Sequence, residues 1–170
     1  MYGEWKYRKN LKRIVAQIAV LMNYLEREEN IDGIVVKGMS GIIPGTLVSQ
    51  QTDIPLVVVR EGEKCSHSYT DIEKDCVRDL TRYVLLDDFV ETGETLVTLM
   101  SKIAVTYPSA KCVGAIFWSG SVSTEVAKIA THIPDFTGKV WSVYGMGEAE
   151  YEQGKHPCER LEEDICSVPS

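Results

Sequence analysis

The residues best suited to chemistry lie in one stretch, Val84 to Leu96, with the sequence VLLDDFVETGETL. Three apolar residues typical of a buried strand lead into the acids Asp87 and Asp88 and then into a turn of small residues. Carboxylates accept hydrogen bonds from vicinal sugar hydroxyls and from water molecules on Mg²⁺. Successive strand residues face opposite sides, so the two acids are not expected to have the same role.

The turn after the acids predicts a phosphate site. The amides of Glu91 to Thr95 would lie at a helix N-terminus, where unpaired N–H groups and the helix dipole attract anions. The hydroxyls of Thr92 and Thr95 add donors, and Gly93 lets the backbone approach the ligand closely. Glu94 should face solvent, because a carboxylate beside a phosphate is unfavourable. The alternative is an ordinary strand-to-helix turn with solvated acids.

Short apolar runs that alternate with helical patterns must position this stretch. The pattern predicts helices over 5–29, 42–51, 95–107 and 122–131, and strands over 34–36, 56–59, 84–86, 113–118 and 140–143. This alternation indicates an α/β fold with a mostly parallel central sheet flanked by helices, in one domain over residues 1–170. Ligands then gather beyond the carboxyl ends of the strands. Residues 147–170 show no clear period.

Two further loops leave predicted strands at that same edge. Lys37 to Gly41 (KGMSG) comes directly after the first strand, and its glycines permit a bend that turns backbone amides toward an anion. Arg60 to Arg82 is polar, long for a connection and typical of a mobile functional loop. It contains Lys64 and His67, although such charges could equally solvate a plain surface loop.

Composition narrows the classes of partner. The chain has 170 residues, 44% hydrophobic and 25% charged, with a net charge of -7. Binding to nucleic acid or a membrane surface requires a basic footprint that this balance does not provide, so neither partner is expected. The 5 cysteines include no CxxC pair, which favours reduced thiols and a cytoplasmic protein, and no apolar run approaches the length of a signal core or a membrane span.

The stretch VLLDDFVETGETL resembles the 5-phosphoribosyl-1-pyrophosphate (PRPP) motif of type I phosphoribosyltransferases. The resemblance implies the Rossmann-like fold of that family, with a flexible loop and a small hood, here from the N- and C-terminal segments. It also implies transfer of 5-phosphoribose from PRPP to a nucleobase, dependence on Mg²⁺, and a homodimer. A non-catalytic module of the same fold that senses PRPP or nucleotides is the alternative.

The resemblance also assigns residues. Asp87 and Asp88 would hold the ribose hydroxyls and, through water, the metal; Glu91 would exchange a proton with the base; and Lys64 and His67 would join them in catalysis. A purine is favoured over a pyrimidine because the chain is short and has Glu91. PRPP would also contact two groups of residues, Lys37, Gly38, Met39, Ser40 and Arg60 in the loops, and Glu91, Thr92, Gly93, Glu94 and Thr95 in the turn. Trp141 and Tyr144 are candidates for stacking on the base, although aromatic residues near a last strand more often belong to the core.

Overall fold

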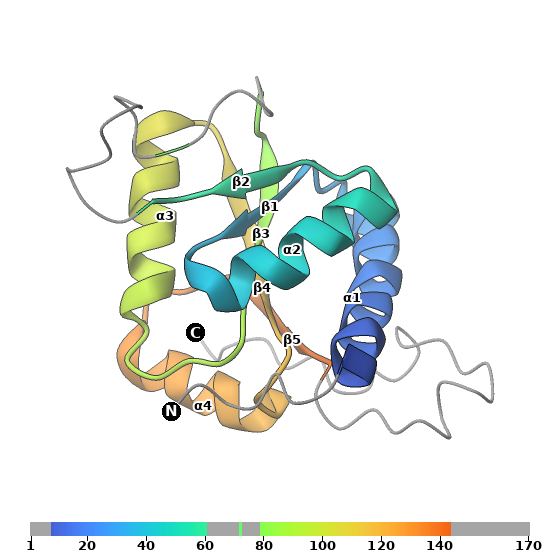
Figure 1. Cartoon of the computed structure of the whole chain (residues 1–170). Helices are drawn as coiled ribbons and strands as arrows, with labels where there is room; N and C mark the ends of the chain where they lie inside the picture. The colour runs from blue at the N-terminus through green and yellow to red at the C-terminus, as the bar shows by residue number, and fades with distance from the viewer. Residues whose placement is uncertain (1–7, 61–71, 73–78, 144–170) are drawn as a thin grey trace.

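The structure is a computed structural model that describes residues 8–60, 72 and 79–143. These residues form four helices and five strands that alternate along most of the chain (Figure 1). In order they are α1 (Arg8–Glu29), β1 (Gly33–Val36), α2 (Gly38–Thr52), β2 (Leu56–Val58), β3 (Arg82–Asp87), α3 (Glu94–Thr106), β4 (Lys111–Phe117), α4 (Val122–His132) and β5 (Lys139–Ser142).

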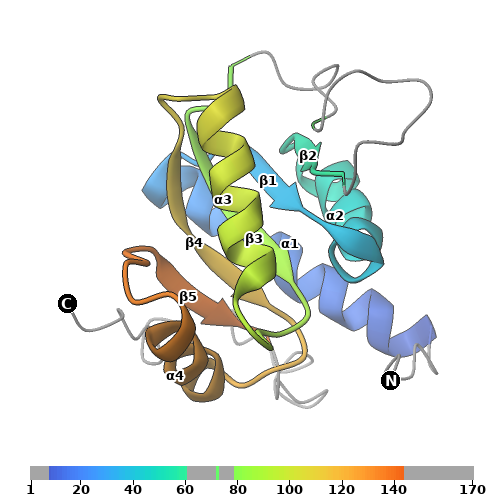
Figure 2. The ribbon, with the colours of Figure 1, turned by 90° about the vertical axis from the view of Figure 1, so that its left-hand side faces the viewer.

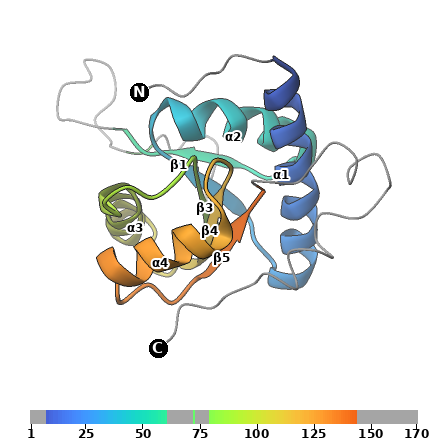
Figure 3. The ribbon, with the colours of Figure 1, turned by 90° about the horizontal axis from the view of Figure 1, so that it is seen from below.

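The five described strands pair in parallel in the order β2-β1-β3-β4-β5. Helices α1 and α2 cover one face of this sheet, and α3 and α4 cover the other (Figure 3). The predicted α/β architecture with a mostly parallel sheet is therefore confirmed. Strands buried on both faces explain why β1 and β3 read as continuous apolar runs without alternation.

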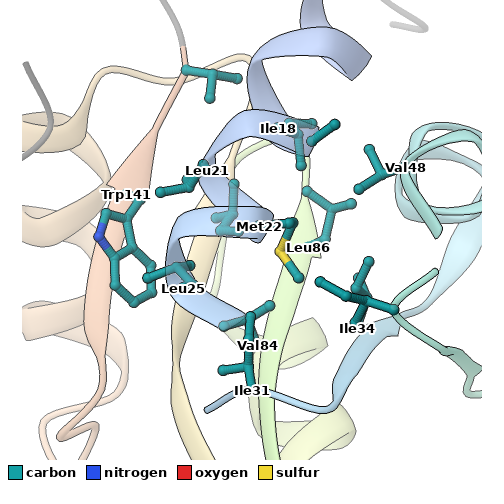
Figure 4. Close-up of a cluster of buried hydrophobic side chains, with 14 of the residues drawn as sticks. Ile18, Leu21, Met22, Leu25, Ile31, Ile34, Val48, Val84, Leu86 and Trp141 are labelled. Carbon is teal, nitrogen blue, oxygen red and sulfur yellow. The ribbon is translucent and has the colours of Figure 1, made fainter. Parts of the chain in front are cut away.

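The α1 face of the sheet holds one of the two apolar cores. The buried stripe of α1 has helical spacing and includes Ile18, Leu21, Met22 and Leu25, which pack on strand residues such as Leu86 (Figure 4). The opposite core lies beneath α3 and α4. Neighbouring strand residues divide between these cores, since their side chains point to opposite faces.

The strand order reverses direction between β1 and β3. The chain leaves β1 toward β2 on one side, and leaves β3 toward β4 on the other. In an open parallel sheet, the connections at such a switch point diverge and leave a crevice at the carboxyl ends of the two strands. Figure 2 shows the sheet from the side covered by α3, with β1 and β3 side by side. The crevice thus lies beside the residues directly after Val36 and Asp87.

The loop after β1 is shorter than predicted. Helix α2 begins at Gly38 instead of Ile42, so most of the predicted loop Lys37 to Gly41 is the first turn of this helix. Pro44 consequently lies inside α2 and not in its first turn. Residues 5–7 of the first predicted helix lie outside the described residues, the other boundaries differ by at most two residues, and β3 extends to include Asp87. Within the described residues, no helix combines the length and apolar character needed to cross a membrane.

Candidate functional site

A pocket of about 550 Å³ opens at the β1–β3 switch point. The described residues that line it are Lys37, Gly38 and Ser40 after β1, and every residue from Asp87 to Leu96 after β3. Two segments about fifty residues apart in the chain meet here, because β1 and β3 are neighbours in the sheet. The pocket contains the whole acidic and small-residue turn that the sequence indicated.

Asp87 joins the two segments. Its Oδ1 accepts a hydrogen bond from the hydroxyl of Ser40 at 2.8 Å and another from the backbone N–H of Asp88 at 2.9 Å. The residue is 7% exposed. Burial raises the pKa of Asp87 to about 7 by disfavouring the charged carboxylate, and the negative charge of Asp88 adds to this, while the two hydrogen bonds oppose it. Asp87 therefore changes charge near neutral pH.

Asp88 occupies a different environment. It is half-buried, its Oδ1 accepts the N–H of Phe89 at 3.0 Å, and its carbonyl accepts the N–H of Ser119 at 2.9 Å. The backbone carbonyls of both acids accept N–H groups of the loop after β4, but the Asp87 side chain reaches the segment after β1, whereas the Asp88 side chain accepts a bond within its own turn. The side chains of the two acids therefore have different partners, and their separate roles stay a prediction.

The turn into α3 has the backbone of an anion site. Gly93 is the N-cap of α3, with a φ of 75°, and it has no side chain with which to cap this end. The Glu94 N–H has only a long contact with the Thr92 hydroxyl, at 3.4 Å. The first N–H groups of an α-helix lack intrahelical partners and can therefore bind a ligand. Glu91, Thr92 and Glu94 are exposed, as expected for Glu94, yet all three still line the pocket.

Glu125 supports this turn from behind and was not predicted from the sequence. The side chain is 1% exposed on α4, and its Oε2 accepts the backbone N–H of Val90. Lys128 lies 3.3 Å from Glu125 Oε1, with its Nζ 5.2 Å from the centre of the Phe89 ring. The signal available in the sequence was an acid on the apolar face of a predicted helix, between Val122 and Ile129.

Other predicted site residues lie elsewhere. Met39 is 61% exposed and does not line the pocket. Arg60 lies after β2, where its carbonyl accepts Lys102 Nζ at 3.0 Å, and it too is outside the described lining. Trp141 is 1% exposed in the core beside α1 (Figure 4), so its predicted contact with a base is corrected: the indole is already packed. Three further candidates fall outside the described residues: Lys64, His67 and Tyr144.

The curated proteins that resemble this chain in sequence include two phosphoribosyltransferase-type relatives. HGPRTase-like protein 2 of Natrialba magadii is 38% identical over 85 residues, and the hypoxanthine/guanine phosphoribosyltransferase of Methanocorpusculum labreanum is 31% identical over 88. The matches cover 44% and 45% of this chain and 47% of each relative, so the chain spans about half the length of the relatives it matches. No family profile matches the sequence.

Solved structures share the fold. The adenine phosphoribosyltransferase of Saccharomyces cerevisiae superposes with a TM-score of 0.61 at 14% identity, covering 81% of this chain and 80% of that one. The UMP synthase of Leishmania donovani gives a TM-score of 0.54 at 16% identity, covering 90% of this chain and 35% of that one. At these identities the likeness concerns the fold.

Proposed function

We propose that this chain is a type I phosphoribosyltransferase, as its fold and its sequence relatives support, and that it transfers 5-phosphoribose from PRPP to a nucleobase and releases pyrophosphate. One observation carries the proposal: the segment after β1 and the complete turn Asp87 to Leu96 line a single pocket at the β1–β3 switch point. Paired acids, a helix N-terminus and a second loop are the features that a phosphorylated sugar with a pyrophosphate group requires.

The donor would lie along this pocket. The 5-phosphate would bind the amides of Glu91 to Thr95, where the unpaired N–H groups of α3 begin. The ribose hydroxyls would donate to Asp88, which is half-buried and lines the pocket, and to Asp87. The pyrophosphate would meet Lys37 and the first turn of α2, which line the same pocket on the other side. In this proposal, the pyrophosphate would also be contacted by three residues of the segment that follows β2, namely Arg60, Lys64 and His67.

The acids also fit Mg²⁺, which prefers oxygen ligands and commonly combines one or two carboxylates with substrate phosphates and water. Asp87 and Asp88 are two adjacent carboxylates in a pocket with room for both water and a phosphorylated ligand. Bound there, Mg²⁺ would neutralise charge on the pyrophosphate.

The chemistry exchanges one bond at the anomeric carbon for another. The bond from C1 of the ribose to the pyrophosphate oxygen breaks, the electron pair leaves with pyrophosphate, and a nitrogen of the base forms the new bond to C1. Nearby carboxylates stabilise the positive charge that develops on the sugar, and Glu91 accepts the proton that the base loses. Lys37 and the amides at the start of α2 stabilise the leaving group.

A purine is the favoured acceptor. The name of the Methanocorpusculum labreanum relative specifies hypoxanthine and guanine, both oxopurines. Glu91 is exposed at the pocket, where a carboxylate can exchange a proton with a ring nitrogen. These two features support an oxopurine acceptor over a pyrimidine.

A sensor of PRPP that does not turn it over is the second candidate. Its support is Glu94, a carboxylate that lines the pocket at the turn proposed to hold the 5-phosphate. The two candidates agree on the ligand and differ in whether the bound PRPP reacts.

Pyrophosphate release distinguishes them. The full chain would be incubated with PRPP, Mg²⁺ and separately with hypoxanthine, guanine, adenine, xanthine, uracil and orotate. Transfer predicts release with at least one base, fastest with an oxopurine. PRPP binding with no release for every base would favour the sensor, and release only with uracil or orotate would overturn the purine preference.

Calorimetry tests the donor site itself. Replacing both acids, Asp87→Asn with Asp88→Asn, should abolish measurable PRPP binding in the presence of Mg²⁺. The matched control replaces two exposed acids outside the pocket, Asp53→Asn with Asp135→Asn, which makes the same change in net charge. Equal PRPP affinity in both double variants would reject the proposed site.

A further inference from the structure

Helix α2 has a proline at a position where a hydrogen-bond donor is normally required. In an α-helix the N–H of residue 44 would donate to the carbonyl of residue 40. Position 44 is Pro44, which has no N–H, so α2 cannot supply this bond to Ser40. The affected residue is the one whose hydroxyl reaches Asp87. The proline therefore removes a backbone restraint at the point where the two segments of the site meet.

Trp118 supplies a donor from a third loop. It lies directly after β4, and its indole Nε1–H donates to the carbonyl of Ser40 at 3.2 Å. The backbone N–H of Trp118 donates to the carbonyl of Asp87 at 3.3 Å. Its half-buried ring packs on the core that α1 shares with the sheet. One residue thus holds the main chain of both Ser40 and Asp87.

We infer that Trp118 is a positioning residue whose indole N–H replaces the donor missing at Pro44. It so keeps the Ser40 hydroxyl on Asp87, and the start of α2 beside the turn Asp87 to Leu96 that is proposed to bind PRPP (the PRPP turn). The inference rests on the proposed function and assigns to that site a residue outside its described lining. A tryptophan with only a packing role would stabilise the fold whatever residue stood at position 44. The two roles therefore differ in their dependence on Pro44.

A double-mutant cycle measures this dependence. Trp118→Phe keeps an aromatic ring and removes the N–H, whereas Pro44→Ala returns a backbone N–H within reach of the Ser40 carbonyl. With Mg²⁺ present, Trp118→Phe should raise the Kd for PRPP roughly fivefold, the effect of one neutral hydrogen bond. Pro44→Ala alone should leave the Kd within about twofold of wild type, and the double variant should return to within about twofold of Pro44→Ala.

Two results would overturn the inference. One is an equal rise in Kd for Trp118→Phe whether it is made in wild type or in the Pro44→Ala variant, which would assign the effect to ring packing. The other is a Trp118→Phe protein with reduced thermal stability and an unchanged Kd, which would make the residue structural only. Unfolding curves of all four proteins accompany the binding measurements, so loss of folded protein is not counted as loss of affinity.

A readout without ligand keeps this inference separate from the proposed function. The backbone N–H of Asp88 donates to the same Asp87 Oδ1 that accepts the Ser40 hydroxyl, so its amide resonance reports on that pair. Trp118→Phe should shift this resonance in the free protein, and Pro44→Ala should reverse the shift. If wild type failed to bind PRPP, the proposed function would fail, and the positioning role would then be decided by this resonance: an Asp88 amide that did not move in Trp118→Phe would overturn it.

Discussion

The hydroxyl of Ser40 donates to Oδ1 of Asp87 across 2.8 Å, joining the first turn of α2 to the end of β3. The bond connects residues 47 positions apart in the chain. It gives one carboxylate of the candidate site a fixed partner, while Asp88 has its partners in its own turn and in the loop after β4. The Ser40–Asp87 bond thereby fixes the position of the segment after β1 relative to the segment after β3, and these two segments line the pocket.

The buried carboxyl of Asp87 predicts a specific dependence of stability on pH. Its folded pKa of about 7 lies above the ordinary value of 3.8, so the folded protein binds more protons than the unfolded chain between these values. The contribution of Asp87 to the free energy of unfolding should therefore decrease as pH rises from about 4 to about 7, and be constant outside that window. Denaturant unfolding of wild type and Asp87→Asn, compared pH by pH, isolates this contribution.

The amide of Asp87→Asn does not titrate, so the variant should gain stability relative to wild type as pH rises through this window. Ser40→Ala provides the matched control, because the Ser40 hydroxyl lowers the pKa of Asp87 and its removal should move the upper end of the window to higher pH. A constant difference between wild type and Asp87→Asn from pH 4 to 7 would contradict the raised pKa.

Glu125 should position the PRPP turn through the amide of Val90. In Glu125→Leu this N–H loses its acceptor, which should lower the free energy of unfolding by about 1 to 3 kcal/mol and weaken PRPP binding, because the turn is no longer fixed. Glu125→Gln keeps an oxygen acceptor and should restore most of both quantities. Calorimetric Kd values and chemical denaturation would be measured on both proteins.

Lys128→Ala tests whether the ion pair of Glu125 with Lys128, and not its hydrogen bond to Val90, positions the turn. The Lys128 side chain is 34% exposed, and its pair with Glu125 should contribute less than about 1 kcal/mol. If Lys128→Ala weakened PRPP binding as much as Glu125→Leu, the ion pair and the Phe89 contact would be the important interactions. The hydrogen bond to Val90 would then have little part in positioning.

The parts of the site that could be predicted from sequence are those carried by local order. An apolar run, two acids and a TGET turn indicate a strand, its carboxyl end and a helix start within one continuous stretch, and the structure has them in that order. Trp141 shows the limit, since an aromatic residue near a last strand can face either a ligand or the core, and the choice depends on how α1 packs. Whether an aromatic side chain packs against a distant helix depends on the tertiary fold, so the local sequence does not determine it.

Pro44 and Glu125 show the same limit for polar groups. A helix that began at Ile42 would have had Pro44 in its first turn, whereas α2 begins at Gly38 and has Pro44 inside it. The donor to the Ser40 carbonyl is the indole of Trp118, 78 residues farther along the chain. Glu125 lies 35 residues beyond the amide that it accepts. Both partnerships depend on the strand order β1-β3-β4, which places the loop after β4 near the residues that follow β3 and, across β3, near those that follow β1.

Gly93 should tolerate no side chain. Its φ of 75° is unfavourable for other residues, and a Cβ there would lie 2.8 Å from Cγ1 of Ile133. Gly93→Ala should lower the free energy of unfolding by about 2 to 4 kcal/mol, combining backbone strain with overpacking. Gly38 is a matched control, because its φ is 69° but its surroundings are open, so Gly38→Ala should cost about 1 kcal/mol. Equal losses would show that Ile133 moves aside.

Trp141 should affect stability and not the choice of base. The indole is 1% exposed in the core beneath α1, so Trp141→Ala should lower the free energy of unfolding by about 3 to 5 kcal/mol. Trp141→Phe fills much of the same space and should retain most of that stability. The Trp141 side chain does not line the described pocket. For every base that wild type accepts as a substrate, Trp141→Phe should therefore have the same KM as wild type. A change in KM for one base relative to another, with stability retained, would return Trp141 to the base site and require β5 to rearrange on binding.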